Sequence, residues 1–247
     1  MLYSMDYMMG LPLHCKGEES GSCDDLYFED GAWKLRHVVA VDGGFVFKKR
    51  SLVSPESIDR VELAANQGVF PLLISKQVLD SAPEFESEVP FSRAVETAAL
   101  KHYQLAPYWL SAPGRETTGI ASGYPADDPL PKESMPQEME PNLRSLKEVL
   151  GYEVRNGEKS LGRACDLILD LSDFSVAYLA VDTKPSESGG VRLVSTKQKD
   201  ISLSVDYASK SFCTKCSSYH LQESPSADLS EGRLTLGDQQ KVDLSSY

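Results

Sequence analysis

The sequence repeats itself once, at an offset of 141 residues. Leu2 aligns with Leu143, and the register continues without a gap to Ser54 over Ser195. Nine of these 53 positions are identical, where average composition gives about three. The identical pairs are Leu2/Leu143, Ser4/Ser145, Gly10/Gly151, Gly21/Gly162, Asp25/Asp166, Leu26/Leu167, Leu52/Leu193, Val53/Val194 and Ser54/Ser195. After a one-residue insertion, 70–83 aligns with 212–225, so the chain contains two copies of one unit.

The duplication predicts two domains with a connector between them. The prolines of the connector are Pro113, Pro125, Pro129, Pro131, Pro136 and Pro141. This density excludes a continuous helix or a central strand, so we expect an extended, acidic linker. The predicted parts are a first domain over 1–110 with a helical and aromatic extension, a linker over 111–142, a second domain over 143–225 and a tail over 226–247.

Within each copy the pattern is that of short strands and turns. In the first copy, apolar and aromatic residues over 25–29 and 33–41 flank a polar turn, and the second copy has the same order over 166–170 and 174–181. Such a pattern favours hairpins within a small barrel or sandwich. One exception is 92–103, where apolar residues recur at helical spacing and Ser92 is a suitable N-cap.

Both copies resemble the PRC-barrel family, whose small β-barrel occurs in the photosynthetic reaction-centre H subunit and in a ribosome-maturation factor. The phrases that carry the resemblance are 21–28, 33–39, 43–44, 52–55 and 74–83 in the first copy, and 143–145, 151–152, 161–162, 181–182 and 194–195 in the second. Ser92-Arg93 with Glu96, and Tyr103 with 107–109, resemble the aromatic segment that closes the first copy of bacterial tandem PRC-barrel proteins. The resemblance implies a mainly β fold of two PRC-barrel-like small β-barrels, with one short helix in the first copy.

The sequence departs from that family in two places. Lys184-Pro185 stands where relatives carry a glycine, and the second copy has no counterpart of the helix or of 107–109. The resemblance implies a non-catalytic domain that binds proteins. No segment matches the membrane helix of the H subunit, so a role as an accessory of photosynthetic or membrane complexes rests on family analogy only.

Charge and cysteine content restrict the compartment and the partners. The formal net charge of −12 disfavours general nucleic-acid binding, because an acidic surface repels phosphate backbones. No apolar window is long enough for a membrane-spanning helix, so we expect no direct membrane insertion. Five cysteines, an odd number without a secretory signal, indicate reduced thiols and a cytoplasmic protein. The resemblance to tandem PRC-barrel proteins implies a bacterial one.

Cys213 and Cys216 have the C-x-x-C spacing of zinc and redox sites. His220 offers a third ligand, but the sequence contains no second pair of this kind. The alignment puts both cysteines in a predicted strand, where residues three apart face opposite sides. Structural thiols are therefore the favoured interpretation, and we expect no metal and no cofactor.

Other candidate groups have simpler interpretations. Asp24, Asp25, Glu29 and Asp30 lack the spacing of a calcium loop and predict a solvated hairpin rim. His37 lies in a mainly apolar strand, where a packed, half-buried ring is favoured over acid–base chemistry. The sequence has no nucleophile elbow and no phosphate-binding loop, so we expect no catalytic residue.

The aromatic segment at the end of the first copy is the candidate interaction surface. Its residues are Tyr103, Leu105, Tyr108, Trp109 and Leu110. Large aromatic side chains supply much of the binding energy at protein interfaces. They are also suited to covering the open end of a small barrel, and the sequence leaves both interpretations open.

The function expected from the sequence is a non-catalytic scaffold or adaptor that binds a protein partner or associates with itself as a homo-oligomer. An alternative is small-ligand or metal binding in the cleft between the two barrels. An enzymatic role is least favoured, because no nucleophile is paired with a base.

Overall fold

The structure, a computed structural model, describes residues 1–42, 49–65, 68–85, 93–110, 142–183, 190–198, 200–229, 232 and 234–236. The strands of the first repeat are β1 (Leu2–Ser4), β2 (Pro12–Cys15), β3 (Glu18–Glu29), β4 (Lys34–Asp42), β5 (Lys49–Val53) and β6 (Phe70–Leu72). Its helical segments are α1 (Met5–Met8), η1 (Pro55–Ser57), α2 (Arg60–Ala65), α3 (Lys76–Asp80), α4 (Arg93–His102) and η2 (Tyr108–Leu110).

The second repeat follows the same order. Its strands are β7 (Leu143–Ser145), β8 (Glu153–Asn156), β9 (Lys159–Asp170), β10 (Ser175–Asp182), β11 (Val191–Ser195), β12 (Ser204–Asp206) and β13 (Ser211–Cys213). Its helices are α5 (Leu146–Val149) and α6 (Ser218–Glu223), and β14 (Ala227–Asp228) and β15 (Thr235–Leu236) come last. The predicted linker over 111–142 lies outside the described residues, except for its last residue.

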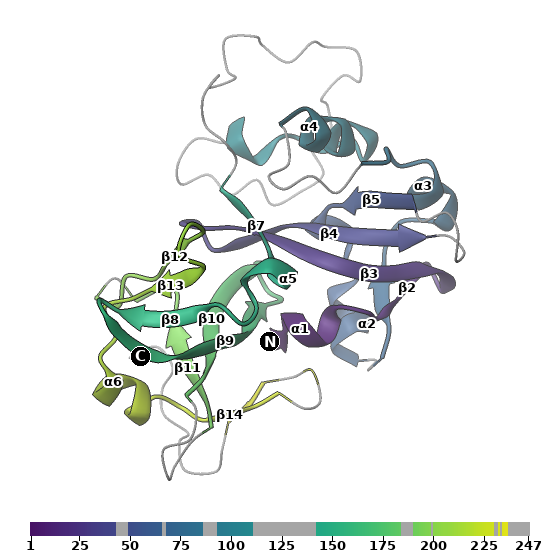
Figure 1. Ribbon diagram of the computed structural model, residues 1–247. Coiled ribbons are helices and arrows are strands. Elements are labelled where there is room, and N and C mark those ends of the chain that lie inside the picture. The colour runs from purple at the N-terminus through teal and green to yellow at the C-terminus, as the bar shows by residue number, and fades with distance from the viewer. Residues whose placement is uncertain are drawn as a thin grey trace.

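One large sheet runs through both repeats (Figure 1). Among the described residues it has 13 strands, and its main path is β12-β13-β8-β9-β10-β4-β3-β2-β6. The pairing is mixed, because β2 runs parallel to β6 and β8 parallel to β13 whereas the other pairs are antiparallel. The prediction of a mainly β chain is confirmed. The prediction of two separate PRC-barrel-like small β-barrels is wrong: the sheet is continuous and curls into a half-barrel.

The element positions follow the alignment of the two copies. β3 and β9 are both 12 residues long and begin 141 positions apart, at Glu18 and Lys159. Leu13 pairs with Phe70 in the first repeat, and Val154 pairs with Phe212 in the second. The segment between the two paired residues is one residue longer in the second repeat, which is the insertion that the alignment requires before position 212.

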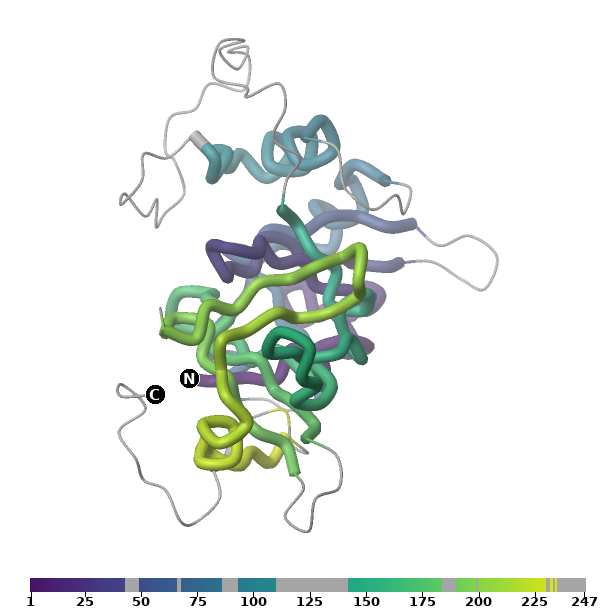
Figure 2. The backbone as a smooth tube through the Cα atoms, turned by 60° about the vertical axis from the view of Figure 1, so that its left-hand side comes forward, coloured from purple at the N-terminus to yellow at the C-terminus, as the bar shows by residue number. Residues whose placement is uncertain are grey.

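The repeats exchange their first strands. β1 of the first repeat pairs antiparallel with β9 of the second, with Tyr3 opposite Leu169. β7 of the second repeat pairs in the same way with β3 of the first, with Arg144 opposite Phe28. Figure 2 shows the consequence, since the purple N-terminal end lies among the green strands of the second repeat. Neither repeat therefore forms its sheet from its own strands alone.

The two repeats also meet at the centre of the sheet. β4 and β10 touch at one point, where Lys34 lies opposite Ser175. There the Leu35 amide donates to the Phe174 carbonyl at 2.9 Å, and the Val176 amide donates to the Trp33 carbonyl at 2.7 Å. Trp33 and Phe174 are equivalent positions, and both have a positive φ, of 51° and 57°. The matching bonds and conformations indicate an approximate two-fold relation between the repeats.

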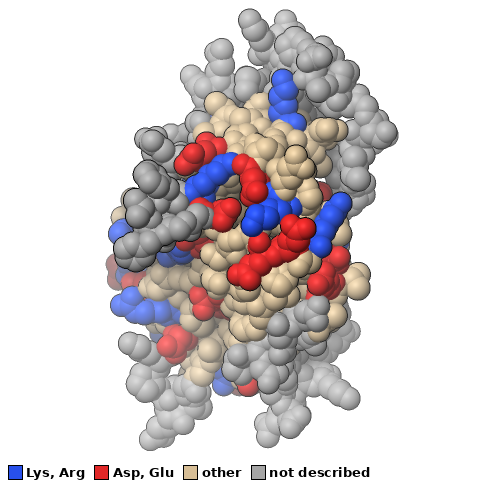
Figure 3. All heavy atoms as spheres, turned by 90° about the vertical axis from the view of Figure 1, so that its right-hand side faces the viewer, with Lys and Arg blue, Asp and Glu red and all other residues tan. Residues whose placement is uncertain are grey.

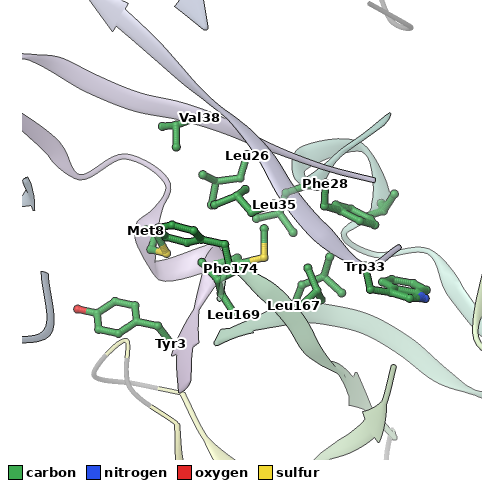
Figure 4. Packing of buried hydrophobic residues seen from close by; sticks show 14 of the residues in the cluster. Tyr3, Met8, Leu26, Phe28, Trp33, Leu35, Val38, Leu167, Leu169 and Phe174 are labelled. Carbon is green, nitrogen blue, oxygen red and sulfur yellow. The ribbon is translucent and has the colours of Figure 1, made fainter. Parts of the chain in front are cut away.

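A single apolar cluster fills the space between the repeats, which explains why separate barrels do not form. Figure 4 shows side chains of β3 and β4, such as Leu26 and Leu35, pointing toward side chains of β9, such as Leu167 and Leu169. Phe28 stacks on Trp33, with ring centroids 5.7 Å apart. Because these residues are buried only when both repeats are present, the hydrophobic effect favours one joint core.

The outer faces of the sheet are covered differently in the two repeats. In the first, α4 packs through Ala99 on a cluster that includes Val39 and Leu52 (Figure 1). The equivalent cluster of the second repeat, with Ala180 and Leu193, is covered by Ala227, Leu229 and Leu234. Helix α4 occupies the segment in which apolar spacing predicts a helix. No helix among the described residues is long and apolar enough to cross a membrane.

The identical glycines of the two copies occupy constrained backbone positions. Gly21 has a φ of +75°, and a Cβ there would collide with the backbone carbonyl of Val41 on β4. We expect Gly21→Ala to lower the free energy of unfolding by about 3 kcal/mol, from the left-handed strain and the backbone displacement together. Urea denaturation followed by circular dichroism measures this change.

Gly10 provides a matched control for that substitution. Its φ is +82°, but a Cβ there would meet nothing within 4 Å. Gly10→Ala should therefore cost only about 1 kcal/mol, from backbone strain alone. Equal losses in the two variants would contradict the close approach of β3 to β4 at Gly21.

Candidate functional site

The five residues of the predicted interaction surface do not share one environment. Tyr103 packs against the main core cluster, and its buried hydroxyl has no hydrogen-bond partner among the described residues. Leu105 lines a small pocket beside α4. Tyr108 and Trp109 are partly exposed in η2, and Leu110 ends that turn, although its side chain lies outside the described residues. Tyr103 therefore serves the core, whereas Tyr108 and Trp109 lie at the surface.

A buried carboxyl group lies beneath this surface. Glu96 of α4 is 0% exposed and His37 of β4 is 1% exposed, and Glu96 Oε1 lies 2.9 Å from His37 Nε2. The predicted half-buried ring of His37 is thus fully buried, and it lies against an acidic side chain. An acidic group without a partner would be costly at this depth. The contact therefore fixes α4 to the sheet at one place and in one orientation.

Two further groups complete the surroundings of Glu96. The Tyr108 hydroxyl donates to Oε1 at 2.9 Å, and Arg93 Nη1 donates to Oε2 at 3.0 Å. Arg93 Nη1 also donates to the Tyr108 oxygen at 3.2 Å. Burial, together with the negative charge of Glu96, raises the pKa of Tyr108 above its ordinary value. The phenol therefore stays neutral, and its hydroxyl remains a hydrogen-bond donor to the carboxyl group of Glu96.

Two arginines lie against the rings of the aromatic pair. The Arg36 guanidinium lies 3.9 Å from the centre of the Tyr108 ring, and the Arg93 guanidinium lies 4.2 Å from the centre of the Trp109 ring. The two rings meet edge to face, with centroids 5.0 Å apart. Arg36 is itself oriented by Glu29, to which Nε donates at 2.8 Å. We call Arg36, Arg93, Tyr108 and Trp109 the aromatic clamp.

A small pocket adjoins the aromatic clamp. Its lining residues are Leu35, Arg36, Ser54, Pro55, Glu56, Leu100, Leu105, Ala106 and Tyr108. Its cavity volume of about 50 Å³ is far below the several hundred cubic ångströms of a typical small-molecule site. The pocket therefore suits one inserted side chain rather than a free ligand.

The chemistry of the cluster is that of positioning. Glu96 and His37 are enclosed, and neither lines the pocket. Within the described part of the cluster, the polar groups that contact the carboxyl group are an imidazole, a phenol and a guanidinium, and no serine or cysteine nucleophile lies among them. The buried pair therefore orients the Tyr108 side chain of the clamp.

The two cysteines of the C-x-x-C segment have different environments. Cys213 is exposed at the end of β13, whereas Cys216 is buried beyond the strand, before α6. The predicted strand thus ends before Cys216, but the two thiols still do not face a common site. Among the residues that the structure describes, no group of three or more His, Cys, Asp or Glu side chains is arranged to hold a metal ion.

The acidic rim forms ion pairs with neighbouring basic residues. Asp24 contacts Arg50 and Lys147, and Arg144 Nε donates to Asp30 at 2.6 Å. Burial alone would raise the pKa of Asp24, but Lys147 and Arg50 hold it below its usual value. Figure 3 shows the same mixture on one face, where acidic and basic side chains lie side by side. Asp24, Glu29 and Asp30 of the predicted hairpin rim therefore form ion pairs. The prediction of a solvated position is wrong for Asp25, which is buried and accepts a hydrogen bond from Ser145.

One feature of the sequence indicates that Glu96 has a buried partner. Glu96 shares a helix face with Ala99 and Leu100, three and four positions on, and both of these are buried. An acidic residue on the apolar face of a helix requires a buried partner. His37 is a polar residue in a mainly apolar strand, but it lies 59 positions before Glu96, so local sequence pattern does not reveal the contact.

Glu96 should contribute strongly to the attachment of α4. We expect Glu96→Ala to lower the free energy of unfolding by about 3 kcal/mol, because buried donors lose their common acceptor. Hydrogen exchange in 93–109 should rise with it. Lys101→Ala, on the exposed side of the same helix, is the control and should change the unfolding free energy by at most about 0.5 kcal/mol. Similar values for both variants would contradict the role assigned to Glu96.

Comparison with known proteins gives no match, either among protein-family models or among curated protein sequences. The resemblance to the PRC-barrel family therefore stays a prediction from the residues that carry it. The function of the chain has to follow from the geometry of its own site.

Proposed function

We propose that the protein is a non-catalytic scaffold that binds another protein through the aromatic clamp. The observation that carries this proposal is the partly exposed Tyr108–Trp109 pair, with a guanidinium group against each ring and the buried carboxyl group of Glu96 hydrogen-bonded to Tyr108. Tyrosine, tryptophan and arginine are the residues that most often dominate binding energy at protein interfaces. Because the clamp is already ordered, binding costs little side-chain entropy.

The surroundings of the clamp support the same function. The lining of the adjoining pocket combines apolar side chains, including Pro55, Leu100 and Ala106, with polar groups at Arg36 and Glu56. A mixture of apolar and polar groups is usual at the surface of a protein interface. Its small volume fits the tip of one partner side chain beside Tyr108.

The alternative of a ligand or metal in a cleft between two barrels has no support in the fold. The apolar cluster shared by the repeats occupies the space that such a cleft requires. Self-association remains within the proposal, with a second copy of the chain as the partner. The resemblance to the PRC-barrel family also favours a binding role without catalysis, and we propose a distant relationship in which the two copies share strands. A cytoplasmic location stays a prediction from the cysteine content.

Removal of the Trp109 ring tests the proposal. Truncating a central interface tryptophan typically costs 2 kcal/mol or more, so Trp109→Ala should weaken partner binding by about 30-fold or more. Proteins retained by the wild type in affinity purification, identified by mass spectrometry, should be lost with this variant. Binding of the recovered protein is then titrated by calorimetry, and sedimentation velocity reports whether a second copy is the partner.

Tyr219→Ala is the matched control. Tyr219 is 66% exposed on α6 in the second repeat, so its substitution removes an exposed aromatic ring away from the clamp. Retention of the same partner by wild type and Tyr219→Ala, and its loss from Trp109→Ala, would support the proposal. Identical partners and identical oligomeric states for all three proteins would refute it.

A further inference from the structure

A second pocket lies on the first repeat, between α4 and β5 (Figure 1). Its cavity volume is about 230 Å³, and it shares no lining residue with the pocket beside the aromatic clamp. Most of its lining is apolar, from Leu52, Pro83, Ala94, Val95, Ala98 and Ala99. The floor is buried, since Leu52 and Ala99 are 1% and 4% exposed, whereas Ala94 and Ala98 are exposed at the rim. We call it the Ala98 pocket.

Small side chains on α4 leave this space open. Ala94 and Ala98 are four positions apart, so they lie on the same side of the helix. The volume is below that of a typical small-molecule site but is large enough for one aliphatic side chain. An aliphatic group that enters the pocket leaves water, and the hydrophobic effect therefore favours its insertion.

The second repeat shows which side chains this face of the sheet receives. Leu193 is equivalent to Leu52 in the alignment of the two copies. Its cluster is covered by Leu229 and Leu234, which belong to the same chain. In the first repeat α4 covers the Leu52 cluster instead, and its alanines leave the Ala98 pocket unfilled. By analogy with the second repeat, the unfilled position suits a leucine side chain.

A leucine is exposed elsewhere on the first repeat. Leu73, which directly follows β6, is 53% exposed, and Val61 on α2, the helix that packs beside β6, is 81% exposed. The Leu73 amide donates to the Ser57 carbonyl at 2.7 Å, and the Asp59 amide donates to the Pro71 carbonyl at 3.0 Å. These bonds fix the backbone around both side chains, so docking costs little ordering entropy. We call Val61 and Leu73 the aliphatic patch.

Charged groups beside the two surfaces have opposite signs. Glu84 is the acidic residue in the lining of the Ala98 pocket, and it is exposed. Lys76 lies three positions after Leu73, at the start of α3, and its ammonium group donates to the Glu19 carbonyl at 3.2 Å. Opposite charges at the pocket and at the aliphatic patch favour their encounter and orient one surface on the other.

We propose that the Ala98 pocket is a self-association site, which receives the Leu73 side chain of a second copy of the chain, with Val61 at the rim and Lys76 beside Glu84. Each copy carries both the pocket and the aliphatic patch. A two-fold dimer therefore contains the contact twice and leaves neither surface open. The contact uses no residue of the aromatic clamp, so it does not rest on the proposed function.

Sedimentation equilibrium of the full-length protein over a range of concentrations tests the site. The wild type should dimerise reversibly. Leu73→Ala should raise the dissociation constant by about 100-fold, because burial of each leucine side chain accounts for about tenfold and the dimer contains two such contacts. Since Leu73 is exposed in the single chain, its truncation should leave the circular dichroism spectrum unchanged.

Filling the pocket from within its own chain should have the same effect. Ala98→Leu places an aliphatic side chain in the cavity, so it should weaken dimerisation by a similar factor without lowering the resistance to urea. Ala208→Leu is the matched control, because Ala208 is exposed on the turn between β12 and β13 of the second repeat. This variant should dimerise as the wild type does.

A mixture of the two weakened variants provides the sharpest test. Leu73→Ala keeps an open pocket, and Ala98→Leu keeps an exposed leucine, so a heterodimer of the two regains one of the two contacts. Its dissociation constant should be only about tenfold above that of the wild type, although each variant alone is weakened by about 100-fold.

Recovery of association in the mixture, with wild-type dimerisation of Ala208→Leu and Trp109→Ala, supports the site. A monomeric wild type, a dimer that Leu73→Ala leaves intact, or a mixture that associates no better than its components would overturn it. A dimer lost only in Trp109→Ala would belong to the clamp and would overturn it as well. If Ala98→Leu fails to fold, Lys76→Glu and Glu84→Lys replace it, since each should weaken the dimer and the two together should restore it.

Discussion

The exchange of first strands between the repeats is the constraint on which the rest of the structure depends. Because β1 pairs with β9 and β7 with β3, each repeat lacks a strand that only the other supplies, and the sheet must continue through both. The shared core and the paired bonds at Trp33 and Phe174 follow from that arrangement. A loss of packing in one repeat is therefore transmitted to the other, and the two repeats should unfold as one cooperative unit.

Much of this fold was predictable from the sequence, but the exchange was not. The offset of 141 residues and the alternation of apolar and turn residues predict the order and positions of the strands, as the equal lengths of β3 and β9 confirm. The sequence does not predict which strands pair with each other. Leu2–Ser4 and Leu143–Ser145 share leucine and serine at the same places, so either short strand satisfies either edge. Sequence pattern specifies the face of a strand but not which copy it pairs with.

The candidate site was also predictable only in part. Its residues can be recognised from the sequence, but the contacts that position them depend on the tertiary structure. Residue types alone single out the aromatic segment, and Tyr108 and Trp109 do lie partly exposed. The reason that they are held in place is the contact of Glu96 with His37, which depends on the packing of α4 across β4. A helix pattern predicts that Glu96 faces inward, whereas the identity of its partner requires the position of the helix on the sheet.

The interior of the molecule has kept its two-fold relation, and the exterior has lost it. Trp33 and Phe174 share a conformation, yet His37 of the first repeat corresponds to Tyr178, and Arg36 corresponds to Ala177. The covering of the sheet differs in the same way, with α4 on one repeat and the segment from Ala227 on the other. Because Ala177 cannot supply a guanidinium group, the described part of the second repeat has no equivalent of the aromatic clamp. A partner that recognises the clamp therefore binds at one site per chain, although the fold was built from two copies.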